Sequence, residues 1–313
     1  MNTKDDIQQL KSSLPKELWF NSYPMYLYQN CWNIILDSTI ACQNHFQAQD
    51  TDIIIASIPK TGTTWLKALL FSIFNRKNHP ISESPLLKHN PHELIPQLES
   101  IIYEKPENPN LSLLEICPKL LGTHLPFQSL PTSIKHSNCK IIYVSRNPFD
   151  TFISSWLFYL NYDENESVKS DMIEEYFGKF CEGKFPFGPF EDHVIGYWKE
   201  SLERAEKVFF VKFEDLKADP KVELKKLAEF VGCPFSVDEE RENVIDEIIK
   251  LCSIDKLKEV EANKSGRVYS FIENKWFFRK GEVGDWVNYL SPLMVERFKK
   301  IMDEKFAGSG LEI

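Results

Sequence analysis

Four stretches of the chain have the pattern of strands that are buried on both faces. Residues 53–58, 120–123, 139–145 and 206–213 are rich in Ile, Leu, Val and aromatic residues. Short apolar runs of this kind, rich in β-branched side chains, are typical of strands inside a parallel sheet. We therefore expect a buried parallel sheet whose strands end in polar loops.

Helical patterns lie between and after these runs. Helices are expected after Gly62, around residues 154–156, and at about 171–181, 191–205, 220–231, 239–252 and 292–306. Helices that alternate with strands imply right-handed crossovers and cover both faces of the sheet. The expected fold class is therefore α/β, with a central, mainly parallel sheet flanked by helices on both faces. Residues 259–277 lack a regular period and predict a loop.

The loop after the first strand has the residues of an anion site. Residues 59–65 read Pro-Lys-Thr-Gly-Thr-Thr-Trp, so a lysine, a glycine and three hydroxyl groups precede the next helix. The free N–H groups of a helix N-terminus attract anions, and glycine lets a ligand approach the backbone. The simpler alternative is a solvated turn with one lysine.

The order of these residues indicates which anion is bound. A nucleoside-triphosphate loop has its lysine after the second glycine, whereas Lys60 precedes the only glycine here. The motif resembles the signature of the cytosolic sulfotransferases. That resemblance implies a P-loop-like sulfotransferase fold and 3′-phosphoadenosine-5′-phosphosulfate (PAPS) as sulfate donor, with adenosine 3′,5′-bisphosphate (PAP) as product. On this resemblance the loop residues that bind the cofactor are Lys60, Thr61, Gly62, Thr63, Thr64 and Trp65.

Two further motifs resemble the same family. Arg146 follows the third apolar run, and Ser154 lies about two helical turns later. The resemblance implies that this pair holds the 3′-phosphate of the cofactor, and that residues 279–281 (Arg279, Lys280 and Gly281) close over it. Taken alone, Arg146 would be a surface ion-pair partner, and residues 279–280 a solvated basic pair.

His124 is the candidate base among the seven histidines. It ends an apolar strand and precedes Leu-Pro, whereas the histidines in polar or loop-like surroundings are expected at the surface: His45, His79, His89, His92 and His136. Imidazole can accept a proton and pass it on near neutral pH. Taken alone, a histidine in this position is more often structural than a base. The resemblance implies that it takes the proton of the acceptor hydroxyl, while Lys60 stabilises charge on the leaving group.

The adenine side departs from the family pattern. The resemblance places Phe213 and Ser253 at the cofactor, but Phe213 replaces the usual tyrosine and Ile254 replaces a phenylalanine. The segment through which animal relatives dimerise is also absent, because Val287 and Pro292 stand where that pattern has lysine and valine. We expect a monomer.

Composition limits the wider interpretation. The chain has 313 residues, 42% of them hydrophobic, and no repeat or Gly/Ser linker, so it is expected to form one domain, 1–313. Within this domain, residues 1–44 are expected to contribute to the acceptor side. Residues 259–283 are expected to form a loop or lid over the cofactor. A net charge of −9 argues against nucleic acid. The polar N-terminus and the absence of apolar runs of about 18 residues predict a cytoplasmic protein without membrane contact. No metal-ligand motif is present, so no metal is expected.

The finer resemblance is to the plant soluble branch, whose members sulfate flavonoids, hydroxyjasmonates and brassinosteroids. It implies a small hydrophobic acceptor with a hydroxyl group. Glu191 replaces a family tryptophan in residues 188–193, and we expect it at the acceptor entrance, where its charge would disfavour acidic acceptors. Two alternatives remain at this stage: a catalytically silent nucleotide-binding protein, and a P-loop-type phosphoryl-transfer enzyme.

Overall fold

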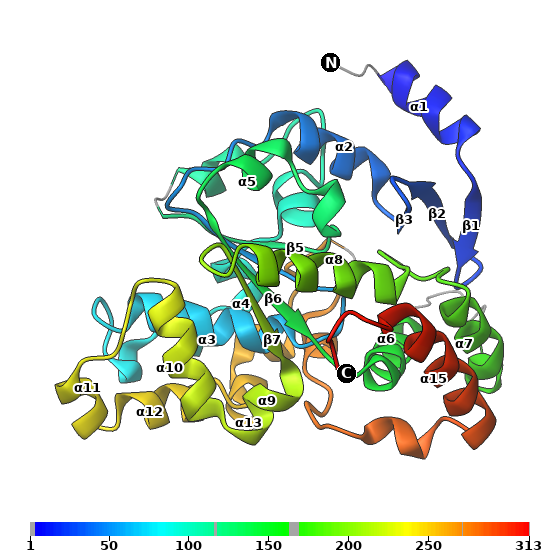
Figure 1. The fold of residues 1–313 in the computed structure, drawn as a ribbon. Coiled ribbons are helices and arrows are strands. Elements are labelled where there is room, and N and C mark those ends of the chain that lie inside the picture. Colours follow the sequence, from blue (N-terminus) through cyan, green and yellow to red (C-terminus); the bar gives the residue numbers. More distant parts are fainter. Residues whose placement is uncertain (1–3, 116–117, 163–168, 271, 313) are drawn as a thin grey trace.

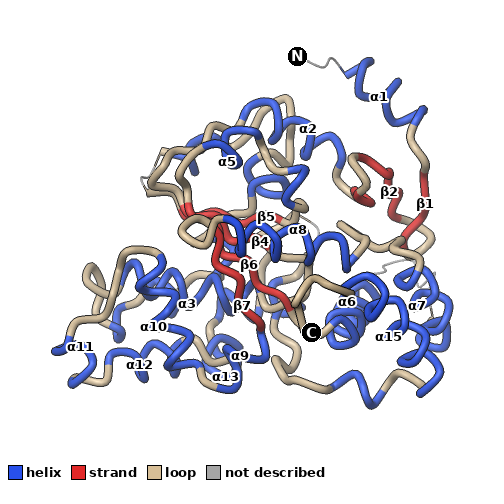
Figure 2. Tube along the Cα trace, viewed as in Figure 1, coloured by secondary structure: helices blue, strands red, loops and turns tan. Residues whose placement is uncertain are grey.

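The computed structural model describes residues 4–115, 118–162, 169–270 and 272–312 (Figure 1). Its centre is a sheet of four parallel strands: β4 (Ile53–Ala56), β5 (Leu120–Thr123), β6 (Lys140–Ser145) and β7 (Val208–Lys212). Their order is β5-β4-β6-β7, and every pairing is parallel. The predicted parallel sheet is therefore confirmed, and Figure 2 shows it at the centre of the molecule among the helices.

Alternating residues of the strands feed two separate hydrophobic cores. Ile54 and Tyr143 face the core formed with helices α6 (Pro148–Tyr162), α7 (Ile173–Cys181), α8 (Phe190–Glu203) and α15 (Pro292–Phe306). Ile55 and Val144 face the core formed with α3 (Thr63–Asn75), α10 (Pro220–Phe230) and α12 (Val244–Leu251). Successive side chains of a strand point to opposite faces, so an apolar strand needs a helical layer on each side. The predicted α/β class with helices on both faces is confirmed.

Most helix predictions agree with the structure, and the differences have local causes. The helix expected at 239–252 is two helices, α11 (Val237–Arg241) and α12, because Asn243 between them has φ 59° in the left-handed region. The strand expected at 206–213 ends at Lys212, since Phe213 begins helix α9 (Phe213–Ala218). The stretch 259–277, predicted to be a loop, contains two short helices, α14 (Glu261–Lys264) and η7 (Asn274–Phe277).

The N-terminal part forms a small sheet that the hydrophobic pattern did not predict. Strands β1 (Lys16–Trp19), β2 (Tyr23–Tyr28) and β3 (Cys31–Asn33) pair antiparallel in that order. In Figure 1 they lie at the right, near α2 (Leu36–His45) and apart from the main sheet, with α1 (Lys4–Ser13) extending outward. The remaining α-helices are α4 (Pro91–Leu94), α5 (Thr132–His136) and α13 (Ile254–Glu259).

The register of the main sheet brings four loops together. Ala56 of β4 is level with Thr123 of β5 and Tyr143 of β6, and Ser145 is level with Lys212 of β7. The loops that follow the four strands therefore start at one edge of the sheet. Open parallel sheets bind their ligands at this carboxyl edge.

Candidate active site

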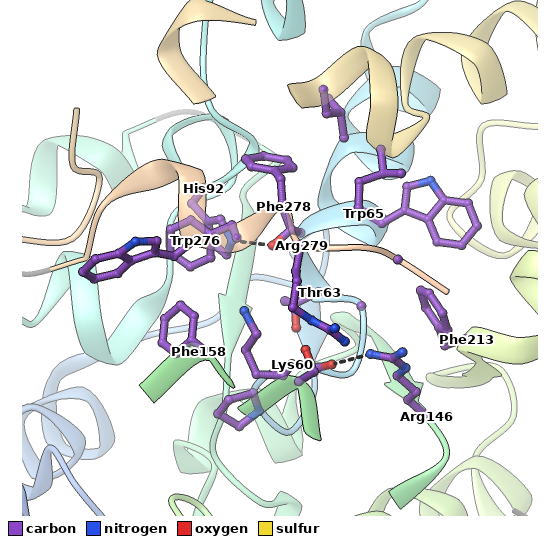
Figure 3. A pocket seen from close by; sticks show the side chains of 18 of the residues that line it. Lys60, Thr63, Trp65, His92, Arg146, Phe158, Phe213, Trp276, Phe278 and Arg279 are labelled. Atoms are coloured by element: carbon purple, nitrogen blue, oxygen red, sulfur yellow. Dashed lines mark hydrogen bonds between the residues drawn. The ribbon is translucent and has the colours of Figure 1, made fainter. Parts of the chain in front are cut away.

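A cavity of about 520 Å³ opens at the carboxyl edge of the sheet (Figure 3). It collects predicted site residues from far apart in the sequence. Those that line it are Lys60, Gly62, Thr63, Thr64, Trp65, His124, Arg146, Ser154, Phe213, Ser253, Arg279, Lys280 and Gly281.

Thr61 is the one predicted loop residue that does not line the cavity. Its side chain is buried, and its hydroxyl lies 2.8 Å from the Ile58 carbonyl oxygen and 3.1 Å from that of Val144. Both partners can only accept, so the hydroxyl hydrogen is committed to the backbone. The expectation that Thr61 offers a hydroxyl donor to a ligand is therefore wrong, and its side chain instead ties the loop to strand β6.

The backbone at Gly62 requires a glycine. Gly62 has φ 108° and is the N-cap of α3. A Cβ atom at this position would lie 2.6 Å from Cδ2 of Phe213. The loop thus packs directly on the ring that follows β7, and the N–H groups of the first turn of α3 remain open toward the cavity.

Lys60 brings a positive charge to the cavity without a matching carboxylate. In the part of the chain that the structure describes it forms no ion pair, and its ammonium lies 3.9 Å from the centre of the Phe158 ring. Burial, together with the charges of Arg279 and Arg146, lowers the pKa of Lys60 to about 7. Figure 3 shows these three cationic side chains around one space.

Arg146 is held by Asp150, in the helix that follows it, and by two backbone carbonyl oxygens. One of its terminal nitrogens lies 3.6 Å from the Asp150 carboxylate and donates to the Glu282 carbonyl oxygen at 2.6 Å. The other donates to the Lys60 carbonyl oxygen at 3.4 Å, and Nε has no hydrogen-bond partner within the described residues. Burial lowers the pKa of Arg146, and Asp150 opposes that shift.

The basic pair at 279–280 is anchored by Asp285. Arg279 contacts one carboxylate oxygen at 2.5 Å and Lys280 contacts the other at 2.7 Å. The Arg279 Nε has no partner among the residues described. Lys60, Arg146 and Arg279 thus converge on one space in which, among the described residues, Lys60 has no counter-ion. A bound polyanion would supply that counter-ion, so the residues present fit a phosphorylated ligand.

Next to Arg146, whose guanidinium lies 4.7 Å from the centre of the Phe213 ring, the cavity wall is aromatic and apolar. Trp65 and Phe213 meet edge to face with ring centroids 5.6 Å apart, and Lys217 lies over the Trp65 ring. Ser253 caps α13, and a Cβ on Gly281 would lie 2.9 Å from Cδ1 of Ile254. The two positions that depart from the family pattern are therefore both part of the cavity wall.

His124 has a defined tautomer. Its Nδ1 lies 2.8 Å from the Ser57 carbonyl oxygen, which can only accept, so Nδ1 carries the proton and Nε2 has a free lone pair. Burial is the main cause that lowers its pKa to about 3, and Lys67, His193 and Lys60 add to it. The backbone N–H of His124 donates to Glu99 Oε1 at 2.6 Å.

His92 was predicted to be a surface residue, and this prediction is wrong. Its side chain is buried, lines the cavity and stacks near Phe277 at a centroid distance of 4.5 Å. It contacts Thr64, Lys67 and Tyr269. The one available signal was Lys67, a single charged residue within the apolar stretch of α3. His193 is a second buried histidine, whose Nε2 donates to the His124 carbonyl oxygen at 3.0 Å.

Comparison with known proteins agrees with this geometry. The sulfotransferase domain family matches residues 50–310. The chain belongs to the sulfotransferase family. It is 46% identical to cytosolic sulfotransferase 5 of Arabidopsis thaliana over 312 residues, covering 98% of this chain and 96% of that protein. It is also 46% identical to cytosolic sulfotransferase 15 of the same plant, covering 98% of this chain and 86% of that protein.

Solved structures confirm the sulfotransferase fold. A provisionally named steroid sulphotransferase of Arabidopsis thaliana is 39% identical with a TM-score of 0.76, over 100% of this chain and 98% of that one. Mouse sulfotransferase SULT7A1, solved with PAP, is 26% identical with a TM-score of 0.69, over 90% of this chain and 94% of that one. The family predicted from the loop motif is thus confirmed.

The sulfotransferase cavity continues from His124 into an apolar part. Ile34 and Ile35 follow the small N-terminal sheet, and they line this part together with Phe158, Tyr159, Phe187 and Trp276. Glu191 does not belong to it. Its side chain is buried elsewhere, with Lys305 3.8 Å away, and burial raises its pKa. The expectation that Glu191 stands at the acceptor entrance is therefore wrong.

The described residues contain no helix that is long and apolar enough to cross a membrane. They also contain no group of three or more His, Cys, Asp or Glu side chains placed to hold a metal ion.

Proposed function

We propose that this sulfotransferase transfers the sulfuryl group of PAPS to a hydroxyl of a small hydrophobic acceptor. The observation that carries the proposal is the placement of His124, with a free Nε2, in the same cavity as the cationic group of Lys60, Arg146 and Arg279. A base and an anion site that share one cavity suit transfer of an anionic group to an alcohol or phenol.

The anion site is proposed to hold the donor at both of its charged ends. Arg146, Ser154, Arg279 and Lys280 would bind the 3′-phosphate. The loop N–H groups after Gly62, with Thr63 and Thr64, would bind the 5′ side. The adenine would pack against Trp65 and Phe213, near Ser253 and Gly281. The mouse relative was solved in complex with PAP, which supports PAP as the kind of ligand proposed here.

When bound, PAPS supplies the sulfuryl group and a leaving bisphosphate. The chain's own contribution at that point is Lys60, whose ammonium has no counter-ion in the described cavity and whose pKa is about 7 there. A nearby anion favours the charged form, so Lys60 is proposed to hold its proton and stabilise the charge that builds on the leaving group.

His124 is proposed as the general base. The Ser57 carbonyl oxygen holds its proton on Nδ1, so Nε2 can accept the proton of the acceptor hydroxyl. Glu99 and His193 fix the backbone of His124 on both sides, through its N–H and its carbonyl oxygen. A base held in this way is oriented before the acceptor binds.

The acceptor is proposed to be a small, largely apolar molecule with one reacting hydroxyl. The walls beyond His124 are aliphatic and aromatic, and they include Ile34, Phe187 and Trp276. We place the protein in the cytosol, in line with the names of its Arabidopsis relatives, and we expect it to act as a monomer, without nucleic acid, membrane or metal.

Two measurements test this function. Titration with PAP and, separately, with ATP should show binding of PAP alone, whereas preference for ATP would favour phosphoryl transfer. Incubation with labelled PAPS and a mixed panel of phenols and alcohols should then yield sulfated products. His124→Ala is the matched control, since it should keep PAP binding and lose transfer by at least about a hundredfold. Binding of PAP without transfer to any acceptor would indicate a silent nucleotide-binding protein.

A further inference from the structure

A cluster of buried polar side chains contacts Thr64 of the anion loop, and apart from the bond of Glu99 to the His124 backbone it has no part in the proposed chemistry. It consists of Lys67, His92, Gln97 and Glu99, which are 0%, 3%, 0% and 0% exposed. Burying such groups is costly unless they are paired. Their mutual contacts form one chain that ends at Thr64, a residue that lines the cavity.

The hydrogen bonds in this cluster have a defined direction, which starts at Glu99. Glu99 Oε1 accepts from Gln97 Nε2 at 3.2 Å, which turns Gln97 Oε1 toward Lys67. Lys67 Nζ donates to that oxygen at 3.0 Å. The amide of Gln97 is thus oriented by the carboxylate behind it, and Lys67 is held in place.

Lys67 in turn selects the tautomer of His92. Its Nζ lies 3.1 Å from His92 Nδ1, and a charged ammonium can only donate. The Tyr269 hydroxyl, 3.1 Å from the same nitrogen, can also donate its hydrogen to Nδ1. With Nδ1 accepting, the ring proton is on Nε2, which lies 2.9 Å from Thr64 Oγ1.

A glycine on the neighbouring strand makes room for this arrangement. A Cβ on Gly122 would lie 2.9 Å from Lys67 Nζ and would also collide with Gln97 Oε1. The space that a side chain of β5 would fill is therefore occupied by the buried ammonium.

We propose that His92 and Lys67 are positioning residues that fix the Thr64 hydroxyl as a hydrogen-bond donor to the anion bound in the loop. Because Thr64 Oγ1 accepts the N–H of His92, its own hydrogen is free to point to a ligand in the cavity. This inference rests on the proposed PAPS site. His92 is neutral, since burial, Lys67, His124 and Lys60 hold its pKa well below the ordinary value. Burial lowers the pKa of Lys67 to about 7, so tests belong at pH 6, where it is charged.

A double-mutant cycle on PAP binding at pH 6 tests the proposal. Thr64→Val removes the hydroxyl, and His92→Asn keeps an oxygen near Lys67 but cannot reach Thr64. Each should weaken PAP by about tenfold, because one hydrogen bond to a charged group is lost. The double variant should also lose about tenfold, since both changes remove the same contact. A loss near a hundredfold would show independent effects and overturn the proposal, as would a wild-type affinity in either single variant.

Two further variants separate positioning from folding. His92→Gln can place an amide N–H near Thr64 and should recover most of the affinity, while His89→Asn, at an exposed histidine of the same segment, should bind as the wild type does. Thermal unfolding without nucleotide checks that each variant is folded.

A measurement on the wild-type protein does not depend on any variant. Long-range ¹H–¹⁵N spectra of the nucleotide-free protein at pH 6 should show His92 protonated on Nε2 alone. Protonation on Nδ1 would overturn the proposal. If the wild-type protein failed to bind PAP at all, the proposed function would be wrong. If it bound PAP but the effects of the two substitutions were additive, only this inference would be wrong.

Discussion

Gly62 packs so closely on Phe213 that a Cβ atom at residue 62 would lie 2.6 Å from Cδ2 of the ring. The loop that carries Lys60 is thus seated on a residue that comes about 150 positions later in the chain. Two independent constraints meet at Gly62, because its φ of 108° also disfavours any side chain.

Gly62→Ala should weaken PAP binding by at least about tenfold, because the loop must shift away from Phe213 and its N–H groups lose their alignment. Calorimetric titration measures the effect. Gly232→Ala is the matched control, since Gly232 also has a positive φ of 76° but has nothing within 4 Å of its Cβ position. It should cost stability of about 1 kcal/mol and leave PAP affinity unchanged. Equal affinity losses in both variants would show that φ strain, and not the contact with Phe213, matters.

PAP affinity should fall as the pH rises above about 7. The pKa of Lys60 is about 7 in the nucleotide-free cavity, and a bound anion raises it, so binding takes up a proton at higher pH. The loss should approach about tenfold per pH unit between the two pKa values. Titrations in buffers of different ionisation enthalpy would measure the proton uptake. Lys60→Met should make the slope clearly shallower, and a slope as steep as that of the wild type in this variant would assign the proton to another group, such as Lys67.

The stability of the nucleotide-free protein should rise with pH, whereas its affinity for PAP should fall. The ordinary pKa of lysine is 10.5, whereas Lys60 and Lys67 both have a pKa of about 7 in the folded state. Between these values the unfolded chain binds more protons, so the contribution of both residues to stability rises with pH. Denaturant unfolding at pH 7 and pH 9 should show a smaller gain for a Lys67→Met variant than for the wild type. An equal gain in the two proteins would contradict the shifted pKa of Lys67.

The fall of kcat at low pH should begin well below the ordinary pKa of histidine. Burial holds the pKa of His124 at about 3, so the ring stays neutral and able to accept a proton at pH 5.5. With saturating PAPS, kcat at pH 5.5 should remain within about threefold of its value at pH 7. His124→Ala should be slow across the whole range. A limb centred near pH 6.5 in the wild type would show that His124 is solvated in the working enzyme.

Asp150→Asn should weaken PAP by about tenfold, because it releases the loop that carries Arg279 and Lys280. The buried Asp150 carboxylate accepts from the N–H of Gly284 at 2.7 Å and from that of Trp286 at 3.1 Å, and it lies 3.6 Å from Arg146. Faster hydrogen exchange at Gly284 and Trp286 should accompany the loss. Asp192→Asn, at a half-exposed acid beside Lys305, is the matched control and should change neither. Unchanged exchange at both amides in Asp150→Asn would show that the loop is held in another way.

The sequence by itself determined the sheet and most of the site. Apolar runs of the length of a strand predicted all four strands. Because the carboxyl ends of parallel strands lie at one edge of a sheet, the residues that follow them also had to lie at that edge: Lys60, His124, Arg146 and Phe213. The loop motif also determined the family, because the order of Lys60 and Gly62 is a local feature that needs no tertiary information.

Only the tertiary structure decided which polar groups are buried and which are free. His92 stands in a polar stretch of sequence, yet it packs beneath the loop, because its partners come from α3 and from Tyr269, far away in the chain. Thr61 looks like its neighbours, but its hydroxyl is bound to the carbonyl oxygen of Val144. The position of Glu191 in a motif predicted that it stands at the acceptor entrance, but its side chain is buried outside the cavity, close to Lys305. Periodicity reports which face of an element is apolar, whereas the partner of a polar side chain depends on contacts that only the folded chain makes.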